Sequence, residues 1–307
     1  MKHLLSLNDW STEEILNCLK LAEKLKNDNS RGVTHHILKG KTLGMIFAKS
    51  STRTRVSFEV GMYQLGGHAL FLSSNDIQLG RGETIYDTAN VLSRYLDGIM
   101  IRTFAQKDVE DLAKYGSIPI INGLTDREHP CQILADLQTI YEHKGRLEGL
   151  KLAYIGDGNN MAHSLLHGCP KVGMDIAIAT PSGYTCDPEM VEQGKAAAAK
   201  SGSKVLITED PAEAIANADI VYGDTWVSMG QEEEKAERLK VFMPYQVNKE
   251  LWKGTNEGAI YLHCLPAYRG YEVTEDIIDG RMSVIFDEAE NRLHAQKAVM
   301  AMLMGNP

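Results

Sequence analysis

Hydroxyl and guanidinium side chains are concentrated in one short segment, residues 50–55, which contains two serines, two threonines and two arginines. An apolar run at 42–48 precedes it and has the length of a buried parallel strand, and the apolar spacing after it fits a partly buried helix. The free N–H groups and the dipole of a helix N-terminus attract anions, and hydroxyl and guanidinium donors strengthen that attraction. The segment therefore predicts a phosphate-binding site at the start of a helix, with a simple N-cap and two solvated arginines as the alternative. The expected donors are Ser51, Thr52, Arg53 and Thr54.

Composition places the chain among globular proteins that act on small molecules. With 307 residues and 43% hydrophobic content, it is long enough for about two domains. A net charge of −9 argues against general binding to nucleic acid. The five cysteines include no Cys-x-x-Cys pair, and no run reaches the ~18 apolar residues of a membrane span. We therefore expect reduced thiols and a cytoplasmic enzyme that binds neither nucleic acid nor a membrane.

Apolar runs alternate with amphipathic segments along the whole chain, which is the pattern of α/β winding. We expect two similar domains, each a mostly parallel sheet flanked by helices, joined by interdomain helices. Strands are expected near residues 42–48, 68–72, 98–101, 118–122, 152–155, 176–179, 205–207, 220–222 and 260–263. Helices are expected after the capping box at 11–14 and near residues 84–95, 107–114, 130–143 and 288–304. The helix at 130–143 connects the two halves.

A second polar cluster precedes that connecting helix. In His129-Pro130-Cys131-Gln132, a histidine and an amide are one turn apart where Pro130 favours a helix start. Donors of this kind suit a carbonyl oxygen that gains negative charge during group transfer. Taken alone, His-Pro-x-Gln is more often structural than functional.

Together with these two clusters, further motifs make the chain resemble the carbamoyltransferases, the family of aspartate and ornithine carbamoyltransferase. Phe47-x-Lys49-x-Ser-Thr-Arg-Thr-Arg55 is similar to the ornithine-type carbamoyl phosphate motif, and His-Pro-x-Gln follows in the family's order. The resemblance covers nearly the whole chain. It implies a carbamoyl phosphate-binding domain at 1–143, with a last helix at 288–307 that packs back on it, and an ornithine-binding domain at 144–287.

The resemblance also implies roles for individual residues. In the family, Arg102, Thr54 and His129 contact the carbonyl oxygen of carbamoyl phosphate, and Gln132 contacts its nitrogen. The catalytic residues it implies are Arg102, His129, Cys264 and Arg292. The carbamoyl phosphate-binding residues it implies are Ser51, Thr52, Arg53, Thr54, Gln78, Arg102, His129, Gln132, Cys264, Leu265 and Arg292.

The polar loop at 73–82 is too long for a tight turn, so it is either a disordered surface loop or a lid. In the family, the matching loop reaches the active site of a neighbouring subunit in a trimer. The resemblance therefore implies a homotrimer with active sites shared between subunits and Gln78 on the adjacent carbamoyl phosphate. Aspartate carbamoyltransferases use a lysine in this loop, and the absence of lysine between Lys49 and Lys107 counts against aspartate as the substrate.

Motifs in the second half resemble those that bind ornithine. Asp224-Thr-Trp-Val-Ser-Met-Gly230 looks like the family's Asp-x-x-x-Ser-Met-Gly loop, although each part alone would be an ordinary loop cap or turn. A carboxylate suits the α-ammonium of an amino acid, and neutral donors suit its carboxylate. The ornithine-binding residues implied are Asn160, Asp224, Ser228 and Met229.

The segment His263-Cys264-Leu265-Pro266 resembles the family's His-Cys-Leu-Pro, in which the cysteine lies beside the side-chain amine and the leucine carbonyl contacts the carbamoyl nitrogen. A covalent cysteine is the alternative, and it is disfavoured because the transfer needs no acyl-enzyme. The family segment often continues with arginine. Here Ala267 follows Pro266, which leaves the role of Arg269 open.

Two other patterns in the second half suggest other chemistry. The segment 154–161 begins a dinucleotide fingerprint but lacks its third small residue, so nicotinamide binding is disfavoured. His163 and His167 have the i,i+4 spacing of a two-ligand metal face, but no third ligand pattern accompanies them, and two histidines on a helix surface are favoured. No metal site is expected.

The implied reaction is transfer of the carbamoyl group of carbamoyl phosphate to the δ-amine of L-ornithine, giving L-citrulline and phosphate, in arginine biosynthesis or in the reverse direction. No cofactor is needed, since the donor molecule is already activated. Putrescine, N-acetylornithine or aspartate as the acceptor remain alternatives, and a nicotinamide-dependent oxidoreductase is a distant one.

Overall fold

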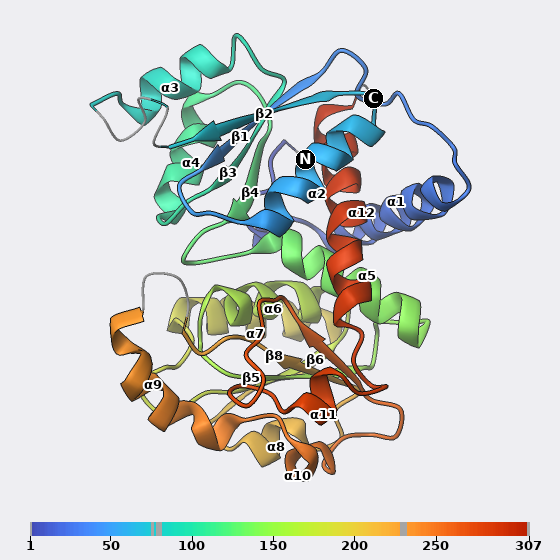
Figure 1. Cartoon of the computed structure of the whole chain (residues 1–307), viewed down its shortest axis with the longest axis vertical. Coiled ribbons are helices and arrows are strands. Elements are labelled where there is room, and N and C mark those ends of the chain that lie inside the picture. Colours follow the sequence, from blue (N-terminus) through green and yellow to red (C-terminus); the bar gives the residue numbers. More distant parts are fainter. Residues whose placement is uncertain (1, 75–76, 78–81, 228–231, 306–307) are drawn as a thin grey trace. The chain divides into compact units, whose positions relative to one another are not determined.

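The computed structural model describes residues 2–74, 77, 82–227 and 232–305, and the chain divides into two compact units. The first unit is Met1–Gln138 with Glu290–Pro307, and the second is Thr139–Ala289 (Figure 1). The chain passes from the first unit to the second within helix α5 (Pro130–Lys144) and returns within helix α12 (Ile285–Met304). The boundaries expected from the sequence, at 143/144 and 287/288, lie in the same two helices.

A four-stranded parallel sheet in the order β2-β1-β3-β4 forms the centre of the first unit. Buried apolar side chains of β1 and β3 make these the central strands, and the more exposed β2 is an edge strand. The strands are β1 (Thr42–Phe47), β2 (His68–Ser73), β3 (Gly98–Arg102) and β4 (Ile120–Leu124). The helices are α1 (Thr12–Ser30), α2 (Thr52–Gln64), α3 (Ile85–Leu92), α4 (Gln106–Tyr115) and the parts of α5 and α12 named above.

The C-terminal part of α12 packs directly on the central strand β3. A Cβ atom added to Gly98 would lie 2.8 Å from Sδ of Met304, so a larger residue there would force the Met304 side chain to move. Lys297 is buried on the same helix and donates to the side-chain oxygen of Gln64 on α2 at 2.8 Å. These contacts hold a helix from the end of the sequence against strands from its first third.

The second unit contains a five-stranded parallel sheet in the order β7-β6-β5-β8-β9. The strands are β5 (Lys151–Ile155), β6 (Asp175–Ala179), β7 (Val205–Thr208), β8 (Ile220–Gly223) and β9 (Ile260–His263). The helices are α6 (Asn160–Lys171), α7 (Pro188–Ser201), α8 (Pro211–Ile215), α9 (Lys235–Phe242), α10 (Lys249–Trp252) and α11 (Glu275–Ile278). Strand order reverses between β5 and β8, and ligands of open α/β sheets bind at the carboxyl ends of strands at such a point.

The predicted fold class of two helix-flanked parallel sheets is confirmed.

The prediction of two surface histidines on α6 is wrong, because His163 and His167 are both buried. Nε2 of His163 accepts from the backbone N–H of Asp187 at 3.0 Å, and Nε2 of His167 is 2.9 Å from Oε1 of Gln193. Both rings connect α6 to the segment that follows β6, a structural use that the helical spacing did not reveal.

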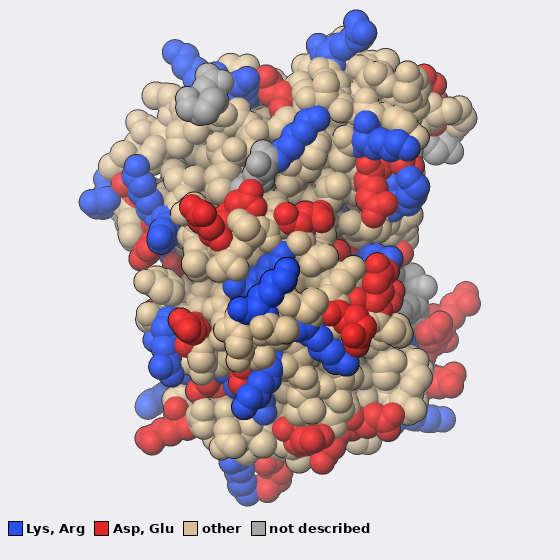
Figure 2. Space-filling view, turned by 180° about the vertical axis from the view of Figure 1, so that it is seen from behind, with Lys and Arg blue, Asp and Glu red and all other residues tan. Residues whose placement is uncertain are grey.

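Charged side chains of both signs are interspersed on the face shown in Figure 2, where no continuous basic stripe is seen. Within residues 2–74, 77, 82–227 and 232–305, no helix combines the length and the hydropathy that a membrane crossing requires.

Candidate active site

The segment predicted from the sequence to bind phosphate, residues 51–54, lies at the N-terminus of α2, shortly after the carboxyl end of β1. We call this segment the seat. Ser51 is the N-cap of this helix, and its Oγ accepts from the backbone N–H of Thr54 at 3.2 Å. The same Oγ is 3.1 Å from Oγ1 of Thr54, which is buried. Thr52 is exposed, and Arg53 is half-buried on the first turn. The N-cap interpretation is therefore correct for Ser51, and it leaves the first turn of α2 lined with polar groups.

Arg292 connects three segments that are far apart in the sequence. This arginine is buried on α12, and its guanidinium donates to Oγ1 of Thr54 at 3.2 Å and to Oε1 of Gln132 at 2.6 Å. It also donates to Oε1 of Gln296 at 2.9 Å. The structure thus brings together the seat on α2, the first turn of α5 and α12, all within the first unit.

Arg102 and His129 add a positive charge and a neutral imidazole to this cluster. Arg102 is the last residue of β3, and His129 immediately precedes α5; both are buried. Burial holds the pKa of His129 well below 6.5, and the neighbouring positive charges of Arg292, Arg102 and Arg53 lower it further. His129 is therefore a neutral imidazole at physiological pH, and a neutral ring still has one N–H that can donate to a carbonyl oxygen.

Several supporting residues in the first unit escaped the sequence motifs. Nε2 of Gln132 donates to Oδ1 of the buried Asp136 at 2.8 Å, so the amide oxygen of Gln132 is directed to Arg292. Nε2 of Gln296 donates to Oγ of Ser57 at 2.7 Å, and Ser57 donates to the carbonyl oxygen of Arg53 at 2.6 Å. Only their positions in the sequence could have indicated these residues, because Asp136 and Ser57 each lie one helical turn after a predicted site residue.

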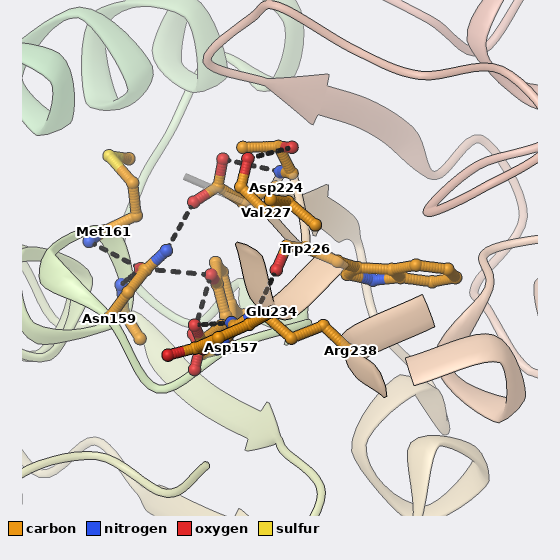
Figure 3. Close-up of polar contacts among 11 residues, drawn as sticks. Asp157, Asn159, Met161, Asp224, Trp226, Val227, Glu234 and Arg238 are labelled. Atoms are coloured by element: carbon orange, nitrogen blue, oxygen red, sulfur yellow. Dashed lines mark hydrogen bonds and ion pairs between the residues drawn. The ribbon is translucent and has the colours of Figure 1, made fainter. Parts of the chain in front are cut away.

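The second unit holds a different arrangement around Asp224, which follows β8 and is buried (Figure 3). Nδ2 of Asn159 donates to its Oδ2 at 2.8 Å. Its Oδ1 accepts from the backbone N–H of Thr225 at 2.7 Å and from Sγ of Cys264 at 3.2 Å. One carboxylate is therefore held by donors from the ends of β5, β8 and β9.

Asn159 and Asn160 have different positions. Asn159 is the N-cap of α6, with its Oδ1 accepting from the backbone N–H groups of Met161 and Ala162, and its amide holds Asp224. Asn160, the residue named from the sequence, is the first residue of α6 and is half-buried. The polar residue before a helix start was the signal for Asn159. The other named residues Gln78, Ser228 and Met229 lie outside the described residues.

Arg238 on α9 anchors the segment that follows Asp224 (Figure 3). Its side chain is 4% exposed; it pairs with Asp157 and donates through Nε to the carbonyl oxygen of Trp226 at 2.5 Å. Its guanidinium carbon lies 4.8 Å from the ring centroid of Tyr184 and 5.1 Å from that of Phe242. Burial raises the pKa of Asp157, and the charge of Arg238 opposes that shift.

The His-Cys-Leu-Pro segment ends β9, and the ring of its histidine is bonded to groups other than the thiol. Nδ1 of His263 accepts from the backbone N–H of Leu265 at 2.9 Å, and its Nε2 is 3.1 Å from Oε1 of Glu272. Both ring nitrogens are therefore occupied, which disfavours a covalent role for Cys264. Arg269 forms an exposed two-bond pair with Asp279, at 2.6 and 2.7 Å.

Comparison with known proteins gives matches over the full chain. Residues 2–142 match the family model described as "Aspartate/ornithine carbamoyltransferase, carbamoyl-P binding domain", and residues 148–303 match "Aspartate/ornithine carbamoyltransferase, Asp/Orn binding domain". The chain belongs to the aspartate/ornithine carbamoyltransferase family.

Similar relatives within the family include the ornithine carbamoyltransferase of Caldicellulosiruptor saccharolyticus, which is 62% identical over 99% of this chain and 98% of the relative. The relative from Pyrococcus furiosus named "Ornithine carbamoyltransferase, anabolic" is 55% identical over 99% of this chain and 96% of its own. The solved ornithine carbamoyltransferase structure from Pyrococcus furiosus has a TM-score of 0.97 and 54% identity, covering 100% of this chain and 98% of that one.

The family's two domain matches do not coincide with the compact units of this chain. Arg292 lies in the match at 148–303, yet it contacts Thr54 and Gln132 of the first unit.

The incomplete dinucleotide fingerprint also has a structural explanation. A Cβ atom on Gly158 would lie 2.3 Å from the backbone nitrogen of Cys186, so this glycine allows two chain segments to approach and needs no bound phosphate.

Proposed function

We propose that this protein transfers the carbamoyl group of carbamoyl phosphate to the δ-amine of L-ornithine, forming L-citrulline and phosphate. The observation that carries the proposal is the buried carboxylate of Asp224, held by Asn159, Thr225 and Cys264 at the end of β8. A fixed carboxylate of this kind suits an α-ammonium group, and the names of the relatives agree with ornithine. The similarity to an enzyme named anabolic supports the citrulline-forming direction, as in arginine biosynthesis.

Carbamoyl phosphate is assigned to the first unit. The start of α2 offers Ser51, Thr52, Arg53 and Thr54 to the phosphate, and helix N-termini favour such anions. Arg102, His129 and Arg292 are assigned to the same ligand, and the family resemblance adds Gln78, Cys264 and Leu265. The amide oxygen of Gln132, which accepts from Arg292, is an acceptor among these donors and suits the carbamoyl amino group.

The chemistry follows from the charges. Attack of a neutral amine on the carbonyl carbon places negative charge on the carbonyl oxygen. Thr54, Arg102 and His129 are the donors proposed to stabilise that oxygen, and one preorganised donor of this kind contributes ~3–4 kcal/mol. The bond from the carbonyl carbon to the phosphate oxygen then breaks, and the phosphate leaves with the proton that the attacking amine loses, its charge balanced by Arg53 and Arg292. No metal or organic cofactor is needed, since carbamoyl phosphate is a mixed anhydride whose carbonyl is already activated.

Ornithine is assigned to the second unit. Asp224 would bind the α-ammonium, and Asn160, Ser228 and the backbone N–H of Met229 would bind the α-carboxylate. Cys264 would lie beside the δ-amine. An amine with a pKa near ~10.4 is mostly protonated at neutral pH, so binding its neutral form costs about 4 kcal/mol at pH 7.4. Activity should therefore rise with pH.

A homotrimer in the cytoplasm is the proposed form of the enzyme. An apolar face on α2 supports the trimer, because patches of this kind mark contacts between proteins. Its exposed side chains are Val56, Val60 and Tyr63, which are about one helical turn apart. All five cysteines are free, and free thiols are usual in a reducing compartment such as the cytoplasm.

The substrate assignment is tested by measuring kcat/KM for ornithine, putrescine, N-acetylornithine and aspartate with carbamoyl phosphate, and by identifying the ureido product. Ornithine should be preferred, and aspartate should be poorest, because its second carboxylate would face Asp224 without a cation. Asp224→Asn should lower kcat/KM for ornithine while carbamoyl phosphate still binds. Preference for a different amine, or an unchanged value for Asp224→Asn, would refute the assignment.

A further inference from the structure

His263 and Glu272 form a buried polar pair whose function is not explained by the substrate contacts proposed above. Their side chains are 0% and 1% exposed. Glu272 lies nine residues after His263, in the segment between β9 and α11. Buried ionisable groups are costly to retain unless their hydrogen bonds are satisfied, so a pair at this depth calls for an explanation.

The hydrogen bonds of the pair define one tautomer of the imidazole. Nδ1 of His263 lies 2.9 Å from the backbone nitrogen of Leu265, which can only donate, so Nδ1 must be the acceptor. The proton therefore resides on Nε2, which donates to Oε1 of Glu272 at 3.1 Å. The same Oε1 accepts from the backbone N–H of Tyr268 at 2.6 Å, which fixes the carboxylate in turn.

The residue held by this arrangement has an unusual backbone conformation. Leu265 has φ of +56°, and among the described residues Asn217 is the one other non-glycine residue with positive φ. The left-handed region is unfavourable for a residue with a side chain such as leucine. The bond from the Leu265 N–H to His263 offsets part of that cost and fixes the peptide between Cys264 and Leu265, from which the Leu265 carbonyl continues.

The other end of the histidine is restrained as well. The backbone N–H of His263 donates to Oε2 of the buried Glu288 at 2.8 Å, and Oε1 of Glu288 accepts from the hydroxyl of Tyr222 at 3.0 Å. Cys264, between the two restrained residues, donates through Sγ to Asp224 at 3.2 Å. Both proposed ligand contacts of this segment, the Cys264 thiol and the Leu265 carbonyl, therefore depend on the backbone that His263 holds.

We infer that His263 is a positioning residue that acts through Leu265, with Glu272 selecting its Nε2–H tautomer, so that the Cys264 thiol and the Leu265 carbonyl are placed for the reaction. The inference rests on the proposed function for its kinetic consequence. The tautomer and the bond to Leu265 do not depend on which substrates the enzyme uses.

Two substitutions separate the two hydrogen bonds of the ring. In His263→Asn, the amide oxygen can occupy the place of Nδ1 and accept from the Leu265 N–H, while the contact with Glu272 is lost. In His263→Gln, the longer side chain reaches toward Glu272, while the acceptor for Leu265 is lost. His263→Gln should lower kcat about tenfold more than His263→Asn, since one hydrogen bond to the backbone separates them. The dissociation constant of carbamoyl phosphate should rise by a smaller factor than kcat falls in both, because the phosphate-binding groups on α2 are untouched and only the contact from the Leu265 carbonyl is weakened.

Thermal unfolding of both variants measures any general loss of structure. Equal kcat values, or a loss of activity that follows the loss of folded protein, would overturn the inference. If neither variant folds, Glu272→Gln and Glu272→Leu provide the second pair. The glutamine keeps an acceptor for Nε2–H and should retain kcat within about threefold, and the leucine should not. Equal activity of that pair would equally overturn the inference.

Nuclear magnetic resonance of the wild-type enzyme labelled with ¹⁵N-histidine gives a readout independent of activity. The His263 ring should show the shifts of a neutral imidazole protonated at Nε2, assigned by the loss of its signals in His263→Gln. A ring protonated at Nδ1 would refute the inference even in an active enzyme. An enzyme with this tautomer that formed no ureido product would instead refute the proposed function.

Discussion

The charge of His129 shows how a single residue is adapted to its proposed task. A histidine with an ordinary pKa near 6.5 would change its charge in the range where enzymes are usually assayed. Here burial is the largest cause of the lowered pKa, followed by Arg292, Arg102 and Arg53. Because a lowered pKa means that the ring loses its proton at lower pH, His129 is neutral at pH 7 and above. It can donate to an oxygen but has no excess proton to deliver.

This charge state leads to a prediction about pH dependence. His129→Ala should lower kcat about 10²–10³-fold, as expected for the loss of one preorganised donor. The shape of the log kcat/KM profile should be unchanged, since the lowered pKa of His129 keeps the ring neutral in the assay and the rise with pH comes from the growing neutral fraction of the ornithine amine. The measurement is a pair of pH profiles, with the wild type as reference. Loss of an inflection near pH 6.5 in the variant would show that His129 acts as an acid or base.

At the level of secondary structure elements, the sequence predicts what depends on local pattern. The strand before Ser51, the cap on α2 and the helix that begins at Pro130 follow from apolar spacing and capping residues. The contact between Arg292 and Thr54 spans 238 positions and has no local signal. Only the return of α12 onto the sheet of the first unit creates it.

Helix α9 contains a buried arginine that its sequence does not reveal. Its sequence Lys-Ala-Glu-Arg-Leu-Lys-Val-Phe has the charge density of a solvated surface helix, and half of its residues are exposed. Arg238 nevertheless points inward to Asp157 and Trp226. The charge pattern of α9 cannot show which of its basic residues is buried, because the partner of Arg238 is Asp157, 81 positions away between β5 and α6.

The buried pair of Arg238 and Asp157 makes α9 an anchor for the segment after Asp224. Arg238→Met keeps an apolar stem beside Tyr184 and Phe242 but leaves Asp157 without its cation, which should destabilise the fold by about 3–5 kcal/mol. The KM for ornithine should rise about tenfold or more, while the dissociation constant of carbamoyl phosphate stays the same, because Trp226 belongs to the proposed ornithine side. Steady-state kinetics and urea unfolding measure these effects.

Lys240→Met is the matched control for this prediction, since Lys240 is on the same helix and is exposed. It should leave both KM values and the unfolding free energy nearly unchanged. Adding Asp157→Asn to Arg238→Met should recover part of the lost stability, because Asp157→Asn removes the carboxylate that Arg238→Met leaves unpaired. An ornithine KM in Arg238→Met equal to that of the control would show that α9 does not position the segment.

At the scale of the whole molecule, each unit has its own sheet and its own set of site residues. The first unit gathers the seat from α2, β3, α5 and α12, and the second gathers Asp224 and its donors from the ends of β5, β8 and β9. On the first unit, α2 carries the seat at its N-terminus and the apolar face along its length. Tyr63 on this face is 81% exposed. The helix proposed to bind phosphate is therefore also the element proposed to contact the next subunit.

The proposed trimer with shared sites makes a quantitative prediction for mixed subunits. Arg102 and Gln78 are assigned to the same carbamoyl phosphate but to different chains. Arg102→Ala and Gln78→Ala should each be nearly inactive alone. In a mixture of equal amounts, the chain that supplies Arg102 to a site is the Gln78→Ala chain, with Arg102 intact, in one half of cases. The neighbour that supplies Gln78 is the Arg102→Ala chain, with Gln78 intact, in one half of cases. Both conditions hold together in one quarter of the sites. The mixture should therefore recover about one quarter of wild-type activity.

The control mixture combines Arg102→Ala with Arg53→Ala. Both arginines belong to the same unit of one chain, so no exchange of subunits can produce a site with both intact, and activity should stay at the level of the separate variants. Native mass spectrometry of isotope-labelled subunits verifies the exchange. Recovery in the first mixture alone requires that each site takes residues from two chains. Equal recovery in both mixtures would trace the gain to something other than composite sites, and no recovery in either after verified exchange would mean that each chain carries a complete site.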